Sequence, residues 1–123
     1  MPFSQIPEPL RAAITARGYS VPTAVQAAVI EPETHNRDLI VSARTGSGKT
    51  VAFGLAMGLD LWSDGSKFPA AGAPSALVIA PTRELALQVS RELTWLFAQV
   101  GARITTCVGG MDASKERRAL YQG

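Results

Sequence analysis

The chain has 123 residues, a length that suits one small domain and leaves no room for two. Its hydrophobic fraction of 46% and charged fraction of 18% are typical of a globular protein and argue against a disordered tail. The formal net charge of +2 permits a nucleic-acid partner but does not by itself argue for one.

Simple patterns argue against a membrane or secretory setting. The longest apolar stretch, 51–62, contains two glycines and Asp60 and is too short to cross hydrocarbon. Residues 1–5 lack the basic start and apolar core of a secretory signal. Cys107 is the only cysteine, so no intrachain disulfide can form and a reducing setting is expected. We therefore expect a cytoplasmic protein with no membrane segment.

The N-terminal part of the chain predicts two helices and one strand. Leu10 and Ile14 share one face of a helix that is expected over 7–17. Thr23 is a favoured N-cap residue and predicts a second helix that runs through residue 30. After a polar break, 39–41 reads Leu-Ile-Val, a short apolar run of the kind that is buried on both faces of a parallel sheet.

Helices and strands continue to alternate farther along the chain. In order we expect a helix over 48–62, a loop over 63–74, a strand at 77–79, an amphipathic helix over 83–100, a strand at 104–108 and a last helix ending at Gln122. Gly54 and Gly58, four residues apart on one helix face, would allow close backbone packing. This alternation indicates an α/β fold with a largely parallel sheet.

Residues 43–50 read Ala-Arg-Thr-Gly-Ser-Gly-Lys-Thr and match the Walker A pattern, with Ala in place of the usual first Gly. The two glycines let the backbone turn tightly, so that successive N–H groups face an anion. Lys49 supplies a full charge to the outer phosphates of a nucleotide, and the Thr50 hydroxyl can ligate Mg²⁺. The residues expected to bind the phosphates are Thr45, Gly46, Ser47, Gly48, Lys49 and Thr50.

The context of this loop supports the same interpretation. A strand is predicted before it and a helix after it, and the helix offers further unpaired N–H groups and the positive end of its dipole. The alternative, a chance Gly/Ser-rich loop before a basic residue, is disfavoured by that context. The loop alone does not say which ATPase family this is.

Further motifs resemble a known family. Residues 18–26 read Gly-Tyr-Ser-Val-Pro-Thr-Ala-Val-Gln and resemble the Q motif of DEAD-box RNA helicases. Residues 81–86 read Pro-Thr-Arg-Glu-Leu-Ala and resemble motif Ia of that family, and Gly109-Gly110 resembles the glycine pair that follows it. With 43–50 as motif I, the motifs occur in family order. The resemblance implies that residues 1–123 form part of the first RecA-like domain, a three-layer sandwich with a mostly parallel sheet, incomplete at its C-terminal end.

The resemblance also assigns roles in nucleotide binding. It implies that Gln26 reads adenine, since a carboxamide can donate to N7 and accept from the exocyclic amine. It implies that Tyr19, or Phe3 upstream, covers an adenine face or packs behind the motif. Lys49 and Thr50 are the expected catalytic residues, with Thr50 as the metal ligand. Taken without its neighbours, Gln26 would be interpreted as an exposed helix residue.

Contacts to RNA are implied in the same way. The residues expected to touch the sugar-phosphate backbone are Pro81, Thr82, Arg83, Gly109 and Gly110. Such contacts carry no base information, as befits enzymes that act on many sequences. An ordinary helix start, with Thr82 as N-cap, is the alternative for the first three residues, and spacing alone favours it.

The sequence departs from the family in several places. Hydrolysis needs a carboxylate that holds Mg²⁺ and another that positions water, yet no Asp-Glu pair occurs here. Asp60 superficially ends a Walker B-like run, but it falls inside the helix after the phosphate loop, and we reject it. Asn36 stands where the family usually has Gly, and Asn tolerates the left-handed conformation of a turn.

The leading hypothesis is the ATP-binding part of an ATP-dependent RNA helicase, which couples ATP binding and hydrolysis to RNA unwinding or remodelling. A nucleotide-binding module without turnover and a P-loop DNA helicase are the alternatives. We expect ATP and Mg²⁺ as cofactors, RNA and a second RecA-like domain of the intact protein as partners, and no turnover by these 123 residues alone. Strand 39–41 would lack its sheet neighbours, which come from later sequence in RecA-like folds, so its open edge predicts self-association.

Other residues with reactive or aromatic side chains are expected to play no part in the site. We expect His35 to be solvated and Cys107 to lie in the core. The aromatic residues at helical spacing are expected to pack: Trp62, Trp95, Phe97 and Tyr121.

Overall fold

The computed structural model describes residues 6–44, 46, 48–61, 74–100, 102–108 and 113–122. Among these residues the helices are α1 (Glu8–Ala16), α2 (Ala24–Val29), α3 (Lys49–Leu61), α4 (Arg83–Leu96) and α5 (Ala113–Gln122), with 3-10 turns η1 (Pro32–Thr34) and η2 (Ala98–Val100). The helices lie where the sequence predicts them, except that α4 ends at Leu96, ahead of η2. Phe3, Trp62 and the expected loop up to residue 73 lie outside the described residues.

Side-chain caps explain where two of the helices begin. The Thr23 N–H donates to Gln26 Oε1 at 3.0 Å, and Thr23 Oγ1 accepts from the Gln26 N–H at 3.4 Å, so that α2 starts with a capping box. Thr82 Oγ1 accepts from the Leu85 N–H at 3.2 Å at the start of α4. Such caps satisfy backbone donors that the first turn leaves without partners. Both threonines confirm the predicted helix starts.

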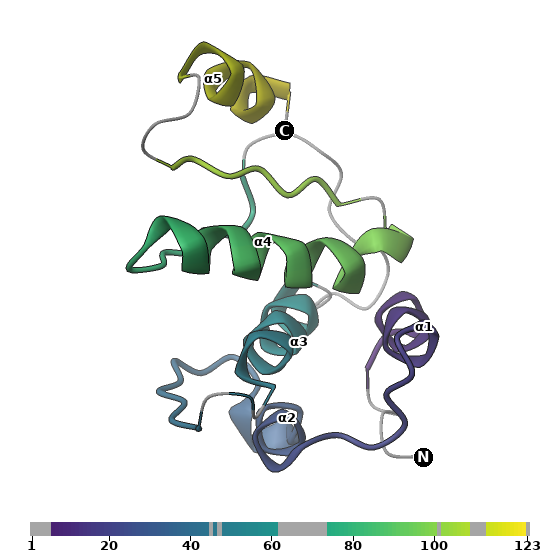
Figure 1. Ribbon diagram of the computed structural model, residues 1–123. Helices are drawn as coiled ribbons and strands as arrows, with labels where there is room; N and C mark the ends of the chain where they lie inside the picture. Colours follow the sequence, from purple (N-terminus) through teal and green to yellow (C-terminus); the bar gives the residue numbers. More distant parts are fainter. Residues whose placement is uncertain are drawn as a thin grey trace.

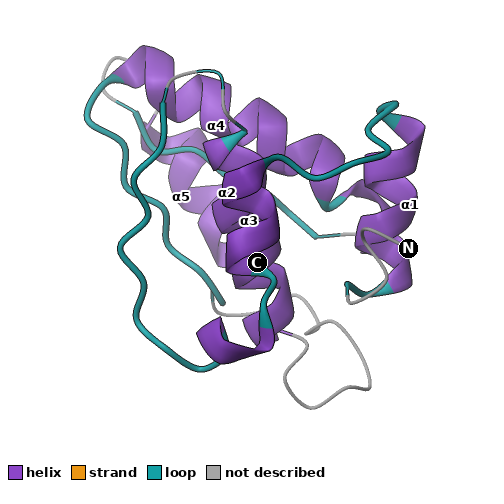
Figure 2. Ribbon diagram, turned by 90° about the horizontal axis from the view of Figure 1, so that it is seen from below, coloured by secondary structure: helices purple, strands orange, loops and turns teal. Residues whose placement is uncertain are grey.

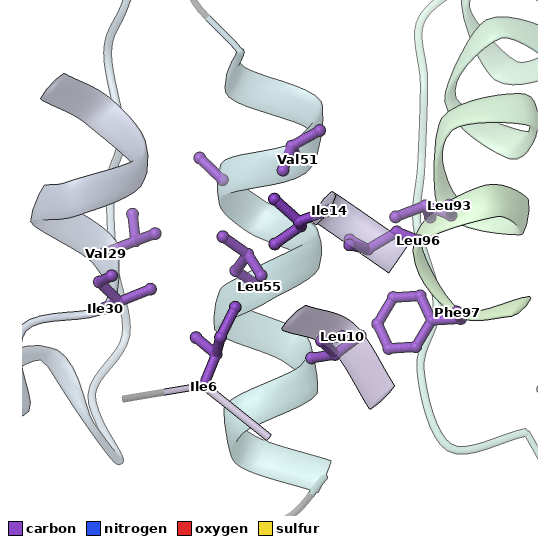
Figure 3. Packing of buried hydrophobic residues seen from close by; sticks show 11 residues of the cluster. Ile6, Leu10, Ile14, Val29, Ile30, Val51, Leu55, Leu93, Leu96 and Phe97 are labelled. Atoms are coloured by element: carbon purple, nitrogen blue, oxygen red, sulfur yellow. The ribbon is translucent and has the colours of Figure 1, made fainter. Parts of the chain in front are cut away.

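The hydrophobic core is built around α3 (Figure 1). This helix packs against α2 and α4, and α1 packs against α4 and η2. The buried apolar side chains come from α1, α2, α3, α4 and the residues next to their ends, and they converge on one another (Figure 3): Ile6, Leu10, Ile14, Val29, Ile30, Val51, Ala52, Leu55, Leu93, Leu96 and Phe97. Removing this apolar surface from water is the main favourable term in holding the helices together.

Two glycines let α3 approach its neighbours closely. A Cβ added at Gly54 would lie 2.7 Å from Leu96 Cδ2, and one added at Gly58 would lie 2.6 Å from Leu10 Cδ1. Both distances are shorter than real side chains allow, so α4 and α1 occupy the space that any larger residue would need. The expectation of close backbone packing at these positions is confirmed.

The segments predicted as strands are loops among the described residues, and no ladder pairs them (Figure 2). The prediction that 39–41 and 77–79 are buried on both faces is wrong for this chain: Ile40 is 102% exposed and Ile79 85%. A parallel strand is buried only when neighbouring strands pair with it and helices cover both faces. The described residues supply helices but no paired strand, so these apolar runs face solvent.

The third such segment, 102–108, shows why Cys107 is exposed and not in the core. Burial alternates along it, with Ile104 and Val108 half-buried and Thr105 and Cys107 exposed. This period of two is that of a chain with one face against the protein and the other in solvent. Cys107 falls on the solvent face, which corrects its expected place in the core.

The helix α5 lies beyond this segment, on the side away from α4 (Figure 1). The Val108 N–H donates to Glu116 Oε1 at 3.1 Å and ties the helix to the segment before it. Across the described ranges, no helix combines the length and the apolar character needed to span a membrane.

Candidate functional site

The phosphate loop has the backbone that its glycines predict. Gly46 and Gly48 have φ values of 81° and 86°, in the left-handed region that side chains rarely adopt. The Gly48 carbonyl accepts from the Ala52 N–H at 2.9 Å, so Gly48 stands at the start of α3. Thr45 and Ser47 lie outside the described residues, so the structure describes the loop at Gly46 and Gly48.

The two residues expected to act on phosphate and metal lie in the first turn of α3. Lys49 is exposed and Thr50 is half-buried. Within the described ranges, no carboxylate forms an ion pair with Lys49. The N–H groups of a first helical turn have no intrahelical partners and point toward the same region. N–H groups of this kind, beside a lysine, are donors suited to a polyphosphate.

Gln26 lies directly against this loop. Its side chain is buried, with 7% exposure, which excludes the alternative of an exposed helix residue. Its Nε2 donates to the Gly48 carbonyl at 3.3 Å, while its Oε1 accepts from Thr23 N. A Cβ added at Gly48 would lie 2.3 Å from Gln26 Nε2. The structure thus joins the segment 18–26 to the phosphate loop through one side chain.

The contact between Gln26 and Gly48 was not predicted from the sequence, although the bond between Gln26 Oε1 and Thr23 N has a sequence signature. A Thr followed three residues later by Gln, just before an apolar run, is the capping-box signature, and it predicts that Gln26 Oε1 is engaged. The bond to Gly48 joins residues 22 positions apart, and no local pattern reports it.

Tyr19 lies against α4. Its ring centroid is 6.0 Å from that of Trp95, with the planes tilted by 51°. The Arg17 guanidinium carbon lies 5.1 Å from the Trp95 ring centroid, and Trp95 Nε1 donates to Glu92 Oε2 at 2.9 Å. Tyr19 thus packs on Trp95 of α4, and its expected place relative to adenine stays a prediction. Trp95 packs, as expected, and holds the start of segment 18–26 on α4.

The segment expected to touch RNA lies at the start of α4. Pro81, Thr82 and Arg83 are exposed, and Thr82 is the N-cap of the helix. Thr82 therefore has the local structure of an ordinary helix start, as the alternative predicts. All three residues are exposed to solvent in this arrangement. Gly109 and Gly110 lie outside the described residues.

Residues set aside by the sequence analysis stay outside the site. His35 is exposed, as expected, and the described residues contain no cluster of His, Cys, Asp or Glu suited to a metal ion. Asp60 is an exposed residue of α3, which confirms its rejection as a strand-end carboxylate. Asn36 has a φ of 59°, the left-handed conformation expected for it. Phe97 is buried in the core, and the side chain of Tyr121 is outside the description.

Several curated proteins are similar in sequence to this chain. The ATP-dependent rRNA helicase rrp3 of Aspergillus oryzae is 43% identical over 113 residues, which are 92% of this chain and 23% of that protein. The rrp3 protein of Schizosaccharomyces pombe is 41% identical over 103 residues, 84% of this chain and 21% of that protein. The DEAD-box ATP-dependent RNA helicase CshA of Geobacillus kaustophilus is 41% identical over 108 residues, 88% of this chain and 22% of that protein. The chain thus spans about a fifth of the length of these relatives.

Solved structures agree with the chain's fold. The RNA helicase Prp28 of Chaetomium thermophilum, bound to ADP, superposes with a TM-score of 0.80 at 36% identity, over 96% of this chain and 28% of that one. A DEAD box protein of Methanococcus jannaschii superposes with a TM-score of 0.71 at 29% identity, over 95% of this chain and 31% of that one. The chain therefore has the fold of the RecA-like part of these helicases.

A family comparison covers most of the chain. Residues 23–123 match the DEAD/DEAH box helicase family, and the matched region includes Gln26, the phosphate loop and the start of α4. The motifs in the sequence, the contact between Gln26 and Gly48, and the superposition on solved helicases agree with this match. The chain belongs to the DEAD/DEAH box helicase family.

Proposed function

We propose that this chain is the ATP-binding part of an ATP-dependent RNA helicase, and that residues 1–123 form part of its first RecA-like domain. The observation that supports this most directly is the buried Gln26 side chain, which is hydrogen-bonded to Gly48 near the end of the phosphate loop. The names of the relatives, all of them RNA helicases, favour this function over a DNA helicase and over a module without turnover. The intact protein would couple ATP binding and hydrolysis to RNA unwinding or remodelling.

The phosphate loop would hold the triphosphate through complementary charge. Lys49 would donate to the outer phosphates, and the Walker A pattern implies that backbone N–H groups of 45–50 would bind the inner ones. The Thr50 hydroxyl, half-buried in the first turn of α3, is the protein's ligand to Mg²⁺. When bound there, Mg²⁺ would neutralise negative charge on the phosphates. Lys49 and Thr50 are the residues of this chain that act on the reacting phosphates.

Gln26 would select the base. A carboxamide donates to adenine N7 and accepts from the exocyclic amine, whereas guanine presents an acceptor where the amine stands. A mismatch leaves polar atoms unpaired at a buried site and costs about 1–3 kcal/mol. Tyr19, which lies against Trp95 of α4, would pack behind segment 18–26.

RNA would bind at the exposed start of α4. Pro81, Thr82 and Arg83, together with Gly109 and Gly110, would contact the sugar-phosphate backbone, as the resemblance implies. A second RecA-like domain of the intact protein would complete the RNA and ATP sites. In that protein 39–41, 77–79 and 104–108 would be parallel strands of one sheet, with 39–41 paired to strands from later sequence. The exposure of 39–41 and 77–79 in this chain supports a requirement for further strands. Cytoplasmic localisation is part of the same proposal.

Competition titration tests the nucleotide assignment. The wild-type protein should prefer ATP to GTP by about 1–3 kcal/mol, and Gln26→Ala should reduce that preference. A matched substitution on the exposed surface of α4, Gln88→Ala, should leave it unchanged. Equal binding of ATP and GTP by the wild type would remove base selection by Gln26 from the proposal.

A further inference from the structure

Besides its place at the edge of the hydrophobic core, Trp95 contacts three polar or aromatic side chains. We propose that Trp95 is a positioning residue for segment 18–26, the segment that would bind the base, and that it acts through Arg17 and Tyr19. This inference rests on the proposed nucleotide site and adds to it a residue that none of the motifs contains. Its basis is the set of contacts around the indole ring.

The indole is held in place by its own helix. Trp95 is half-buried near the end of α4, and its Nε1 donates to Glu92 Oε2 at 2.9 Å, one turn earlier in the helix. A polar N–H on an aromatic ring usually finds such a partner when it is taken out of water. Leu93 and Leu96 are buried in the core and fix the backbone of α4 at this point. The ring therefore has a set orientation on α4.

Two side chains from the end of α1 and the turn after it pack on this ring. The Arg17 guanidinium carbon lies over the Trp95 ring at 5.1 Å from its centroid, and the Tyr19 ring centroid lies 6.0 Å from it. At these distances an aromatic ring attracts a cation or a second, tilted ring. Arg17 and Tyr19 are both exposed and neither belongs to the hydrophobic core. Their contact with Trp95 is therefore what joins them to α4.

The backbone leaves α1 through a turn that carries Tyr19 to α4. The Gly18 N–H donates to the Thr15 carbonyl at 3.0 Å, and the Tyr19 N–H donates to the Ile14 carbonyl at 3.2 Å. With the φ of 87° at Gly18, these bonds form the Schellman pattern that ends many helices. The side chain that follows the glycine in this pattern packs on Trp95, so the turn and the ring contact fix the start of segment 18–26 together.

The middle of the segment has less support. Ser20 and Val21 are exposed, and no hydrogen bond holds 20–22 in the part of the chain that the structure describes. The next anchor is the capping box at Thr23. The path of 20–22 therefore depends on its two ends, at Tyr19 and Thr23. A segment that is ordered before its ligand arrives loses less conformational entropy on binding. The contacts of Trp95 should thus raise the affinity for a base and leave the binding of phosphates unaffected.

A ligand without a base tests this role. Trp95→Leu keeps an apolar side chain and removes the ring. It should lower the affinity for Mg²⁺-ATP by about two- to tenfold, as expected for the loss of an aromatic contact, and leave the affinity for Mg²⁺-tripolyphosphate unchanged. Trp95→Phe keeps an aromatic face and should retain most of the affinity for ATP. Calorimetric titration of the full chain measures both ligands.

Amide exchange in the ligand-free chain tests the physical cause. Trp95→Leu should accelerate exchange of the Tyr19 amide, which donates to the Ile14 carbonyl, by a similar factor. Exchange of the Ala86 amide, which donates to the Thr82 carbonyl at the other end of α4, should not change. Gln88→Leu, a substitution at an exposed position of the same helix, should alter neither exchange nor the affinity for either ligand.

Several outcomes would contradict the inference. An unchanged affinity for ATP in Trp95→Leu would overturn it, and so would an equal loss for ATP and tripolyphosphate, which indicates general destabilisation. A loss for ATP without faster exchange at Tyr19, or an equal loss in Trp95→Phe, would show that the ring does not act by holding the segment. Equal affinity of the wild type for ATP and tripolyphosphate would instead show that the chain binds no base, and would remove the proposed base site together with this inference.

Discussion

At the residue scale, Lys49 is the side chain on which nucleotide binding should depend most. It is exposed in the first turn of α3, and no carboxylate among the described residues forms an ion pair with it. A hydrogen bond to a charged group contributes about 1.5–3 kcal/mol, so Lys49→Ala should weaken ATP binding by about tenfold or more. Calorimetric titration of ATP into both proteins measures the difference.

The matched control for this substitution is Lys115→Ala on α5. It removes the same charge from an exposed helix, so a general electrostatic effect on an anionic ligand would appear in both variants. Equal loss of ATP affinity in the two proteins would contradict a specific role for Lys49.

Single residues also show which contacts a local sequence pattern can predict. The capping box of Thr23 and Gln26 follows from their spacing, and so does the left-handed turn at the phosphate-loop glycines. The bond from Gln26 to Gly48 does not, because it depends on how α2 packs against α3. Local spacing therefore accounts for the cap and the turn, whereas the packing of α2 against α3 determines the contact between Gln26 and Gly48.

At the scale of elements, α3 depends on glycine where it meets α4. A Cβ at Gly54 would lie 2.7 Å from Leu96 Cδ2 and 3.0 Å from Leu93 Cδ2, and both leucines are buried in the core. Overpacking a core costs about 1–3 kcal/mol, and Ala recovers about 1 kcal/mol of that through helix propensity. Gly54→Ala should therefore lower the free energy of unfolding by about 1 kcal/mol, measured by urea titration.

Asp60→Ala is the control on the same helix. Asp60 is exposed, so its substitution should change stability by no more than about 0.5 kcal/mol. If Gly54→Ala stabilised the protein instead, α3 and α4 would have to lie farther apart than the structure has them.

The start of α4 offers a second test at this scale. Thr82 Oγ1 accepts from the Leu85 N–H at 3.2 Å, and removing an N-cap hydroxyl costs about 1 kcal/mol. Thr82→Ala should lower the unfolding midpoint in urea accordingly. Thr82→Ser keeps the hydroxyl and should behave like the wild type. A loss of stability of equal size in the Ser variant would show that the Thr methyl, and not the cap, is responsible.

Helices were more predictable than strands for a physical reason. The apolar face of α1 and the capping residues of α2 and α4 are each formed by residues a few positions apart in the sequence. A parallel strand has no internal hydrogen bonds and needs a partner from elsewhere in the sequence. The apolar runs 39–41 and 77–79 have the composition of strands, but they would be buried only if such partner strands were present.

At the scale of the whole molecule, turnover should be absent from these 123 residues. Hydrolysis of ATP needs carboxylates that hold Mg²⁺ and position water, and the sequence has no Asp-Glu pair to supply them. The purified chain should release no phosphate from ATP above the blank, with or without RNA, while it binds the nucleotide. Phosphate release that Lys49→Ala abolishes would show that the chain holds a catalytic set of its own.

The exposed apolar segments 39–41 and 77–79 should make the isolated chain self-associate. Ile40, Leu77 and Ile79 are more than four-fifths exposed, and no ladder satisfies the backbone of these segments among the described residues. Unpaired strands with apolar side chains are a recognised route to pairing with another chain. Light scattering over a concentration series should show growth in mass, and Ile40→Lys with Ile79→Lys should reduce it, because a charge opposes edge pairing. Thr105→Lys adds the same charge at an exposed position of 102–108 and should not. A compact monomer at all concentrations, with protected amides at 39–41, would show that this segment finds its partners within one chain.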